Sequence, residues 1–300
     1  MEEKTGQRRT GARTGGVKTE LACLPCFFRQ IDRTLSYAGV NGDRGRSIGR
    51  KAEKVIESAS LDEVPARITT LIHRILRDET GVDPYKRVKD AYNRIALDKL
   101  PALRRTAMTI SDPLEGGVRA AIAGNVIDFG IYDSIDLDRS IDESFRLPLP
   151  DAHLRAFTAA VHKSRRILYL CDNAGELVFD RVLLEILRNR GKEVVAVVKG
   201  SPVINDATLD DARAAGLHEC ATVIDNGNDG VGTLLESCSP GFMDAYRSAD
   251  LIISKGQANY ETLAQVKDER IFFLFKVKCS VVAAFLKREN GDLVLMGGRG

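Results

Sequence analysis

The sequence carries almost no excess charge of either sign. Its 300 residues include 44 Lys and Arg against 42 Asp and Glu, which gives a formal net charge of +2. Proteins that bind nucleic acid or an anionic membrane surface usually show a basic excess. The sequence also lacks any apolar run near the roughly 20 residues that a membrane-spanning helix needs. We therefore expect neither a nucleic-acid partner nor a membrane partner.

A secretion signal and a disulfide framework are missing as well. Residues 1–20 are polar and have no apolar central segment, unlike a signal peptide. Six cysteines are too few for a disulfide-framed secreted domain of this length. The overall composition, 44% hydrophobic and 29% charged, is typical of a folded protein. We predict a cytoplasmic protein in which residues 1–20 form a disordered tail.

Residues 21–150 show the periodicity of helices. Their apolar side chains recur three and four residues apart, which is the spacing of a one-sided helix. Asp112 and Pro113 are typical of a helix start, because Asp caps a helix and Pro suits its first turn. No convincing strand alternation occurs in this half, so we predict an N-terminal helical subdomain. The expected helices cover 24–35, 68–76, 85–95 and 113–125.

Residues 151–300 consist of short apolar runs separated by helical stretches. Continuous apolar runs indicate strands that are covered on both faces, as in a parallel sheet. The alternation of strands and helices predicts an α/β fold, a Rossmann-like, doubly wound and mostly parallel sheet with three α/β/α layers. After a helix over 151–164, the expected strands are 167–170, 194–198, 221–224, 251–253, 271–275 and 293–296, and the expected helices are 177–190, 207–215, 231–247 and 260–268.

Polar residues follow the main predicted strands. In an open parallel sheet, ligands bind beyond the carboxyl ends of the strands, where helix N-termini converge. Oxygen ligands from Asp and Asn favour a hard cation such as Mg²⁺ or Mn²⁺, and such a cation facing lysines can hold a phosphoryl group. The alternative is that each loop uses these residues only as turn and helix-cap residues. The residues concerned are Asp172, Asn173, Glu176, Ser201, Asn205, Asp206, Lys255, Asn259 and Lys278.

Other common motifs are weak or absent. The loop after the first strand has one glycine and two acids instead of the dinucleotide fingerprint G-x-G-x-x-G, and no P-loop motif occurs. Cys23 and Cys26 form a C-x-x-C pair, but a zinc site would need two further ligands and no second pair exists. We favour a helix start near the mouth of the site for this pair. None of the four histidines has a metal-ligand spacing.

Six segments, in order along the chain, carry a family resemblance. They are CLPC at 23–26, AGNVID at 123–128, DNAGE at 172–176, SPVINDAT at 201–208, KGQANYE at 255–261 and Lys278-Cys279. Together they resemble the DUF89 family, also called the damage-control phosphatase or ARMT1-like family, in its stand-alone prokaryotic form. The resemblance covers the chain from about residue 21 to the C-terminus, and it agrees with a helical subdomain beside a Rossmann-like sheet.

The resemblance implies a metal-dependent phosphatase, a phosphoric monoester hydrolase that acts on small phosphorylated metabolites. Its substrates would be sugar phosphates or damaged and side-product phosphates. One divalent ion, Mg²⁺, Mn²⁺, Co²⁺ or Ni²⁺, would be held by Asp172, Asn173 and Asp206, with Lys255 on the phosphate side. We add Glu176 as an acid that handles protons or supports the metal site. The expected substrate-side residues are Asn125, Asp128, Ser201, Asn205, Asn259 and Lys278.

Some alternatives stay open from the sequence. The nucleophile is either a water activated by the metal or Asp172 itself, which would form an aspartyl-phosphate. Asn125 and Asp128 are also compatible with a simple helix C-terminal turn. A second function is a non-catalytic nucleotide or small-molecule binding module on the same scaffold. A methyltransferase ranks last, because the sequence has no glycine-rich first turn. The sequence indicates no oligomeric state.

Overall fold

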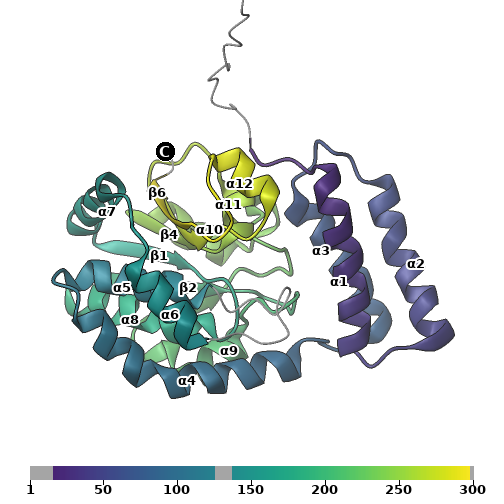
Figure 1. The fold of residues 1–300 in the computed structure, drawn as a ribbon, viewed down its shortest axis with the longest axis horizontal. Helices are drawn as coiled ribbons and strands as arrows, with labels where there is room; N and C mark the ends of the chain where they lie inside the picture. The colour runs from purple at the N-terminus through teal and green to yellow at the C-terminus, as the bar shows by residue number, and fades with distance from the viewer. Residues whose placement is uncertain (1–15, 126–136, 298–300) are drawn as a thin grey trace, which may run out of the picture.

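The computed structural model describes residues 16–125 and 137–297, and a six-stranded sheet forms its centre (Figure 1). The sheet order is β3-β2-β1-β4-β5-β6. The first five strands run parallel, and β6 pairs antiparallel with β5. The strands are β1 (Arg166–Leu170), β2 (Glu193–Val198), β3 (Thr222–Asp225), β4 (Leu251–Lys255), β5 (Ile271–Lys276) and β6 (Leu293–Gly297). The doubly wound α/β fold predicted from the apolar runs is confirmed.

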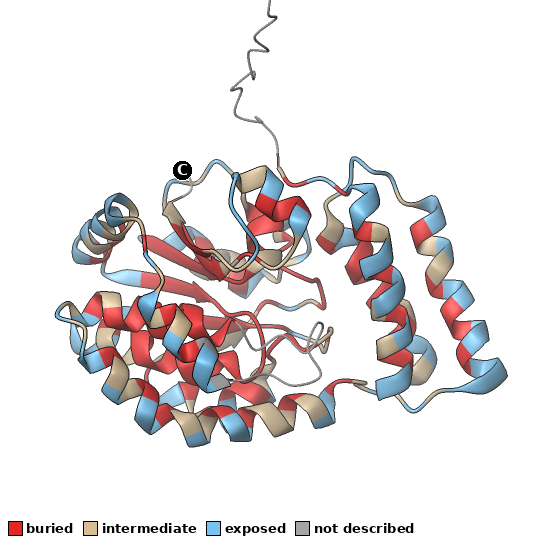
Figure 2. Ribbon diagram, viewed as in Figure 1, coloured by how far each residue is buried: buried red, intermediate tan, exposed pale blue. Residues whose placement is uncertain are grey.

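The sheet is buried on both faces, which explains why its strands are apolar throughout. Ile167 and Tyr169 of β1 belong to one hydrophobic core, and Leu168 and Leu170 belong to the other. This division follows from the alternation of side chains along a strand. Figure 2 shows most of the strands in red, and the helices around them as red on part of their surface and pale blue elsewhere.

Helices α4 to α9 contribute to the first core. They are α4 (Lys86–Met108), α5 (Pro113–Gly124), α6 (Leu137–Arg146), α7 (Asp151–Lys163), α8 (Glu176–Asn189) and α9 (Leu209–Ala214). The small residues of α5 let it lie very close to α8, since a Cβ at Gly124 would stand 2.8 Å from Cβ of Phe179. Because α5 packs so closely against α8, the end of α5 and Asn125 after it lie at the carboxyl ends of the strands.

The second core contains the helices at the two ends of the chain. They are α1 (Leu24–Tyr37), α2 (Gly42–Ser58), α3 (Pro65–Thr80), α10 (Pro240–Ser248), α11 (Gln257–Leu263) and α12 (Ser280–Leu286). Figure 1 shows α1, α2 and α3 as a bundle at one side of the sheet domain. The domain boundary expected at residue 150 stays a prediction. By packing, α1 to α3 form one group, and α4 to α7 lie on the sheet domain.

Several details of the sequence prediction are corrected. The helix expected over 231–247 begins only at Pro240, and a short 3-10 turn, η3 (Leu235–Ser237), precedes it. Gly232 has a positive φ of 70°, which a helix does not accommodate. The helix expected over 260–268 lies at Gln257–Leu263. Three helices, α2, α6 and α12, were not predicted.

The region expected to be a tail, 1–20, is described only from residue 16. There Val17 is buried, and Thr19 bonds through its backbone N–H (2.9 Å) and its hydroxyl (2.8 Å) to the carbonyl of Glu63. Residues 17–19 therefore contribute to the fold, which corrects the expectation for this short stretch. Among the described helices, none combines the length and the apolar character that crossing a membrane requires.

Candidate active site

The site lies where the direction of strand order reverses, between β1 and β4. Asp172 follows β1, and Gly256 follows β4. A Cβ atom at Gly256 would stand only 2.0 Å from Oδ2 of Asp172, and the φ of Gly256 is +82°. The Asp172 carboxylate therefore rests directly on the backbone of the neighbouring crossover. A switch point of this kind is where open α/β sheets bind their ligands.

The loops after β1 and β2 are joined through their backbones. The N–H of Ala207 donates to the carbonyl of Asp172, and the N–H of Ala174 donates to the carbonyl of Asn205, both at 2.9 Å. Asn173 and Asp206 form an isolated antiparallel bridge between these bonds. The three residues expected to hold a metal, Asp172, Asn173 and Asp206, are thus brought together from two separate crossovers.

Two amides fix the carboxylates next to one another. Nδ2 of Asn125 donates to Oδ2 of Asp172 at 3.0 Å and to both carboxylate oxygens of Glu176 at 3.0 and 3.1 Å. Nδ2 of Asn173 donates to the same Asp172 oxygen at 3.0 Å and to Glu176 at 2.9 Å. Oδ1 of Asn125 accepts the N–H of Lys276 at 2.9 Å. Asn125 therefore orients the two acids. The sequence also allowed Asn125 to be only a turn residue at the end of a helix, and these contacts show that it does more.

The electrostatics of this cluster favour a bound cation. The pKa of the Asp172 carboxyl is raised well above its usual range by burial and by the nearby charges of Glu176 and Asp206. Burial also raises the pKa of Asp206, while Lys199, whose Nζ lies 3.3 Å from Oδ2 of Asp206, opposes that rise. Crowded carboxylates of this kind are relieved when a divalent cation shares them.

The donor set matches a hard cation. Among the described residues, no three His, Cys, Asp or Glu side chains converge as a ready-made metal cage. A centre at Asp172 and Asp206 would therefore combine two carboxylates with the amide of Asn173 and with water or substrate oxygens. Mg²⁺ and Mn²⁺ are commonly bound by a few carboxylates in this way.

Lys255 has a different environment from the one expected. Its side chain is fully buried, with Nζ 2.6 Å from Oδ1 of Asp180 and 3.6 Å from Oε2 of Glu176. Oδ1 of Asp180 also accepts the hydroxyl of Tyr169 at 2.7 Å, and burial raises the pKa of Asp180 to about 6. Sequence reasoning missed Asp180 and Tyr169. One feature of the sequence could have indicated Asp180: it is an acid one helical turn after Glu176, in a stretch of α8 that is mostly apolar.

The remaining expected substrate residues fall into different environments. Asn259 is fully engaged by the protein, since it donates to the carbonyls of Cys171 and Lys255 and accepts from Thr233. Lys278 lies close enough for its charge to lower the pKa of Asp172.

Asn205 and Ser201 belong to the loop after β2. Asn205 is buried, and its Nδ2 has no hydrogen-bond partner in the structure. Ser201 is partly exposed. Asp128 lies outside the described residues.

The C-x-x-C pair lies at the start of the helical bundle. Cys23 is buried in the short 3-10 turn η1 (Leu21–Cys23), which contacts α12, and Cys26 is exposed in α1. Gln30 donates to the Cys26 thiol at 3.3 Å. All six cysteines of the chain are free thiols. Helix α12 begins two residues after Lys278. The expectation that the pair lies near the mouth of the site stays a prediction, as does its role.

The strand order defines an α/β protein with a mostly parallel sheet, and the acidic cluster lies at its switch point, where open α/β sheets bind their ligands. Residues 19–294 match the family model of the damage-control phosphatase ARMT1-like domain. The chain therefore belongs to this family, DUF89, as its motifs predicted.

Individual relatives cover nearly the whole chain. An uncharacterized protein of Methanocaldococcus jannaschii is 39% identical over 93% of this chain and 95% of its own length. A damage-control phosphatase of Pyrococcus horikoshii is 35% identical over 93% of this chain and 98% of its own length. The crystal structure of a DUF89 family protein from P. horikoshii superposes with a TM-score of 0.84 at 35% identity, covering 94% of this chain and 99% of that one.

Proposed function

We propose that this chain is a divalent-metal-dependent phosphatase that hydrolyses phosphate monoesters of small metabolites. The substrate class is sugar phosphates or damaged and side-product phosphates. Family membership and relatives named as damage-control phosphatases support phosphatase activity. One observation about this chain carries the proposal further, because the backbone bridge between Asn173 and Asp206 brings the acids of two crossovers to one place.

The metal site that we propose consists of Asp172, Asn173 and Asp206. A divalent cation there supplies charge neutralisation and polarisation of the phosphate group. Asn125 and Gly256 determine where the Asp172 carboxylate lies, the first by a hydrogen bond and the second by close contact. The ammonium of Lys199 lies 3.3 Å from the Asp206 carboxylate and offsets part of its negative charge.

On the phosphate side, we propose that Lys278 provides the ammonium group that meets the equatorial oxygens. Its charge reaches Asp172, whereas the ammonium of Lys255 is fully buried beside Asp180 and Glu176. Lys255 then supports the site by holding Asp180 and Glu176 in place, with its ammonium 2.6 and 3.6 Å from their carboxylate oxygens. Glu176 stands at the first position of α8 and is oriented by two amides, which suits it to hold or release a proton near Asp172.

The test is release of inorganic phosphate from an aryl phosphate. We expect turnover with Mn²⁺, Mg²⁺, Co²⁺ or Ni²⁺, abolition by a chelator, and at least about a 100-fold loss in Asp172→Ala and Asp206→Ala. A panel of phosphorylated sugars, nucleotides and cofactors then identifies the substrate. Full turnover in both variants would overturn the site.

The nucleophile can be identified in the same system. When turnover of a substrate that carries ³²P in its phosphate is quenched with acid, label retained on Asp172 would show that this carboxylate attacks and forms an aspartyl-phosphate, whereas a protein that retains no label would support attack by water.

A binding module on this scaffold is the second candidate, and the same assay separates it. A protein that binds nucleotide without metal and releases no phosphate from any panel member would support this candidate against the enzyme.

A further inference from the structure

The backbone beside Asp206 has an unusual conformation. Ile204 has a φ of +45°, in the left-handed region. A β-branched residue is rarely found there, because its side chain crowds the backbone. Such strain persists only where surrounding contacts hold it, and it is concentrated at functional sites. Since Ile204 is two residues before Asp206, the contacts that hold Ile204 also determine where Asp206 lies.

Helix α3 of the bundle supplies part of those contacts, together with residues of the sheet domain. Nη1 of Arg77 donates to the carbonyl of Pro202 at 2.9 Å. Val203 is buried in a small apolar cluster with Ala66 of α3 and with Val231, and Ile204 packs against the same cluster. The segment 202–204 is therefore fixed from outside the sheet domain, by a hydrogen bond and by apolar contact.

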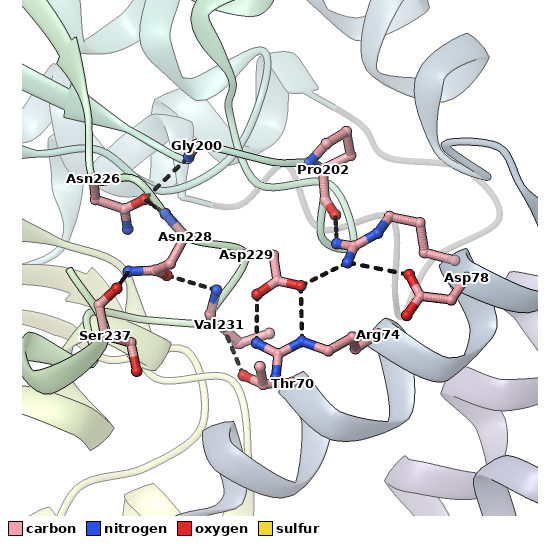
Figure 3. Close-up of polar contacts among 12 residues, drawn as sticks. Thr70, Arg74, Asp78, Gly200, Pro202, Asn226, Asn228, Asp229, Val231 and Ser237 are labelled. Atoms are coloured by element: carbon pink, nitrogen blue, oxygen red, sulfur yellow. Dashed lines mark hydrogen bonds and ion pairs between the residues drawn. The ribbon is translucent and has the colours of Figure 1, made fainter. Parts of the chain in front are cut away.

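Arg77 is itself held in place by an ion pair with Asp229 in the loop after β3. Figure 3 shows Asp229 facing Arg74 of α3. Its Nη2 lies 2.7 Å from Oδ2 of Asp229, and Arg74 bonds both oxygens of that carboxylate at 2.5 and 3.0 Å. Asp229 is largely buried, and its arginine partners hold the pKa of the carboxyl at about 2. Thr70 accepts the N–H of Val231 at 2.9 Å and adds a further connection.

The opposite side of the segment is fixed by the sheet domain. The N–H of Ala207 donates to the carbonyl of Asp172, and the N–H of Lys199 donates to the carbonyl of Ala207 at 2.8 Å. The segment 202–206 is thus held between α3 on one side and the Asp172 loop on the other. Without the α3 contacts, Ile204 would relax toward a negative φ and the chain leading to Asp206 would change direction.

We propose that Arg77 is a positioning residue for the metal site, and that α3 holds the strained 202–206 segment so that Asp206 meets Asp172. The part of this proposal that concerns metal rests on the proposed function. The bundle α1–α3 then contributes to the site, because α3 holds Asp206 in position beside Asp172.

The first test compares Arg77→Gln with a matched variant, Arg67→Gln. Arg67 also lies on α3 and also forms an ion pair with the sheet domain, through Glu236, but among the described residues its side chain bonds to none of 202–206. In the metal-free proteins, hydrogen exchange of peptides covering 202–207 is expected to speed up about tenfold or more in Arg77→Gln. The Arg67→Gln protein is expected to exchange like the wild type.

The second test measures Mn²⁺ binding by calorimetry. We expect Arg77→Gln to weaken it about 10- to 100-fold, as when groups that orient metal ligands are lost. The double variant Arg77→Gln/Ile204→Asn is expected to recover most of the affinity, because Asn tolerates the left-handed region. General loosening of the bundle would not be rescued by a change at residue 204.

The outcomes separate the two proposals. Unchanged exchange at 202–207 in Arg77→Gln, or equal acceleration in Arg67→Gln, would overturn the positioning role whatever the metal data show. Loss of Mn²⁺ affinity without rescue by Ile204→Asn would also contradict it. A wild-type protein that neither binds Mn²⁺ nor releases phosphate would refute the proposed function, while the exchange experiment would still decide the role of Arg77.

Discussion

At the scale of single residues, the site depends on a few close approaches that side-chain chemistry alone does not reveal. The polar residues after the parallel strands indicated the edge of the sheet where a site would lie, and the family resemblance singled out Asp172, Asn173 and Asp206 there. It did not indicate that Gly256 leaves room for the Asp172 carboxylate, or that Asp180 pairs with Lys255. Both features depend on which strands become neighbours, and a local pattern holds no information on that.

Replacing Gly256 by alanine tests the close approach. The new methyl group would overlap Oδ2 of Asp172, and φ at this position is +82°. We expect Mn²⁺ affinity to fall about 10- to 100-fold, with a loss of about 1–3 kcal/mol in the free energy of unfolding. Calorimetry and urea denaturation measure the two effects.

The matched control is Gly241→Ala in α10, where a Cβ meets nothing within 4 Å. It should keep the Mn²⁺ affinity of the wild type. Wild-type affinity in Gly256→Ala as well would show that the Asp172 carboxylate is not needed where the structure places it.

At the scale of elements, the strands were predictable and several helices were not. A strand buried on both faces is a continuous apolar run, and each such run in the sequence became a strand. Helix α2 was missed because glycines and charged residues interrupt its apolar stripe. The helix expected from 231 was displaced to Pro240, since the glycine-rich turn before it bonds to Thr70 of α3 instead. Tertiary contacts decided these cases.

Helices α3 and α11 are joined through a buried acid. The Glu261 carboxylate accepts from Gln257 at 2.9 Å and from the backbone N–H of Ala66, at the start of α3. Burial raises the pKa of Glu261 from 4.5 to about 7. The folded protein therefore keeps a proton on Glu261 that the unfolded chain releases. The contribution of this group to stability is complete below about pH 4.5 and is lost as the pH rises through about 7.

The variant Glu261→Gln should flatten this dependence. Between pH 5 and pH 8 we expect the wild type to lose about 3 kcal/mol more of its unfolding free energy than the variant. Urea denaturation at the two pH values measures the difference. Glu57→Gln, a change at an exposed position of α2, controls for the loss of one charge. Parallel profiles for Glu261→Gln and the wild type would contradict the assignment.

At the scale of the whole molecule, the fold places acids from two crossovers at one switch point and supports them from a separate bundle. Periodicity predicted the sheet, and parallel-sheet topology predicted the edge where the site lies. The contribution of α3 could not be predicted, because Arg77 and Pro202 are 125 residues apart in sequence. Nothing local to either residue marks this contact.

The central claim is that the carboxylates of Asp172 and Asp206 bind the same cation. Calorimetric titration of Mn²⁺ into the wild type, Asp172→Asn and Asp206→Asn measures this directly, because both substitutions keep the size of the side chain. The account predicts one tight Mn²⁺ per wild-type chain and at least about a 100-fold weaker affinity in each variant. Binding of one Mn²⁺ with wild-type affinity by both variants would contradict it.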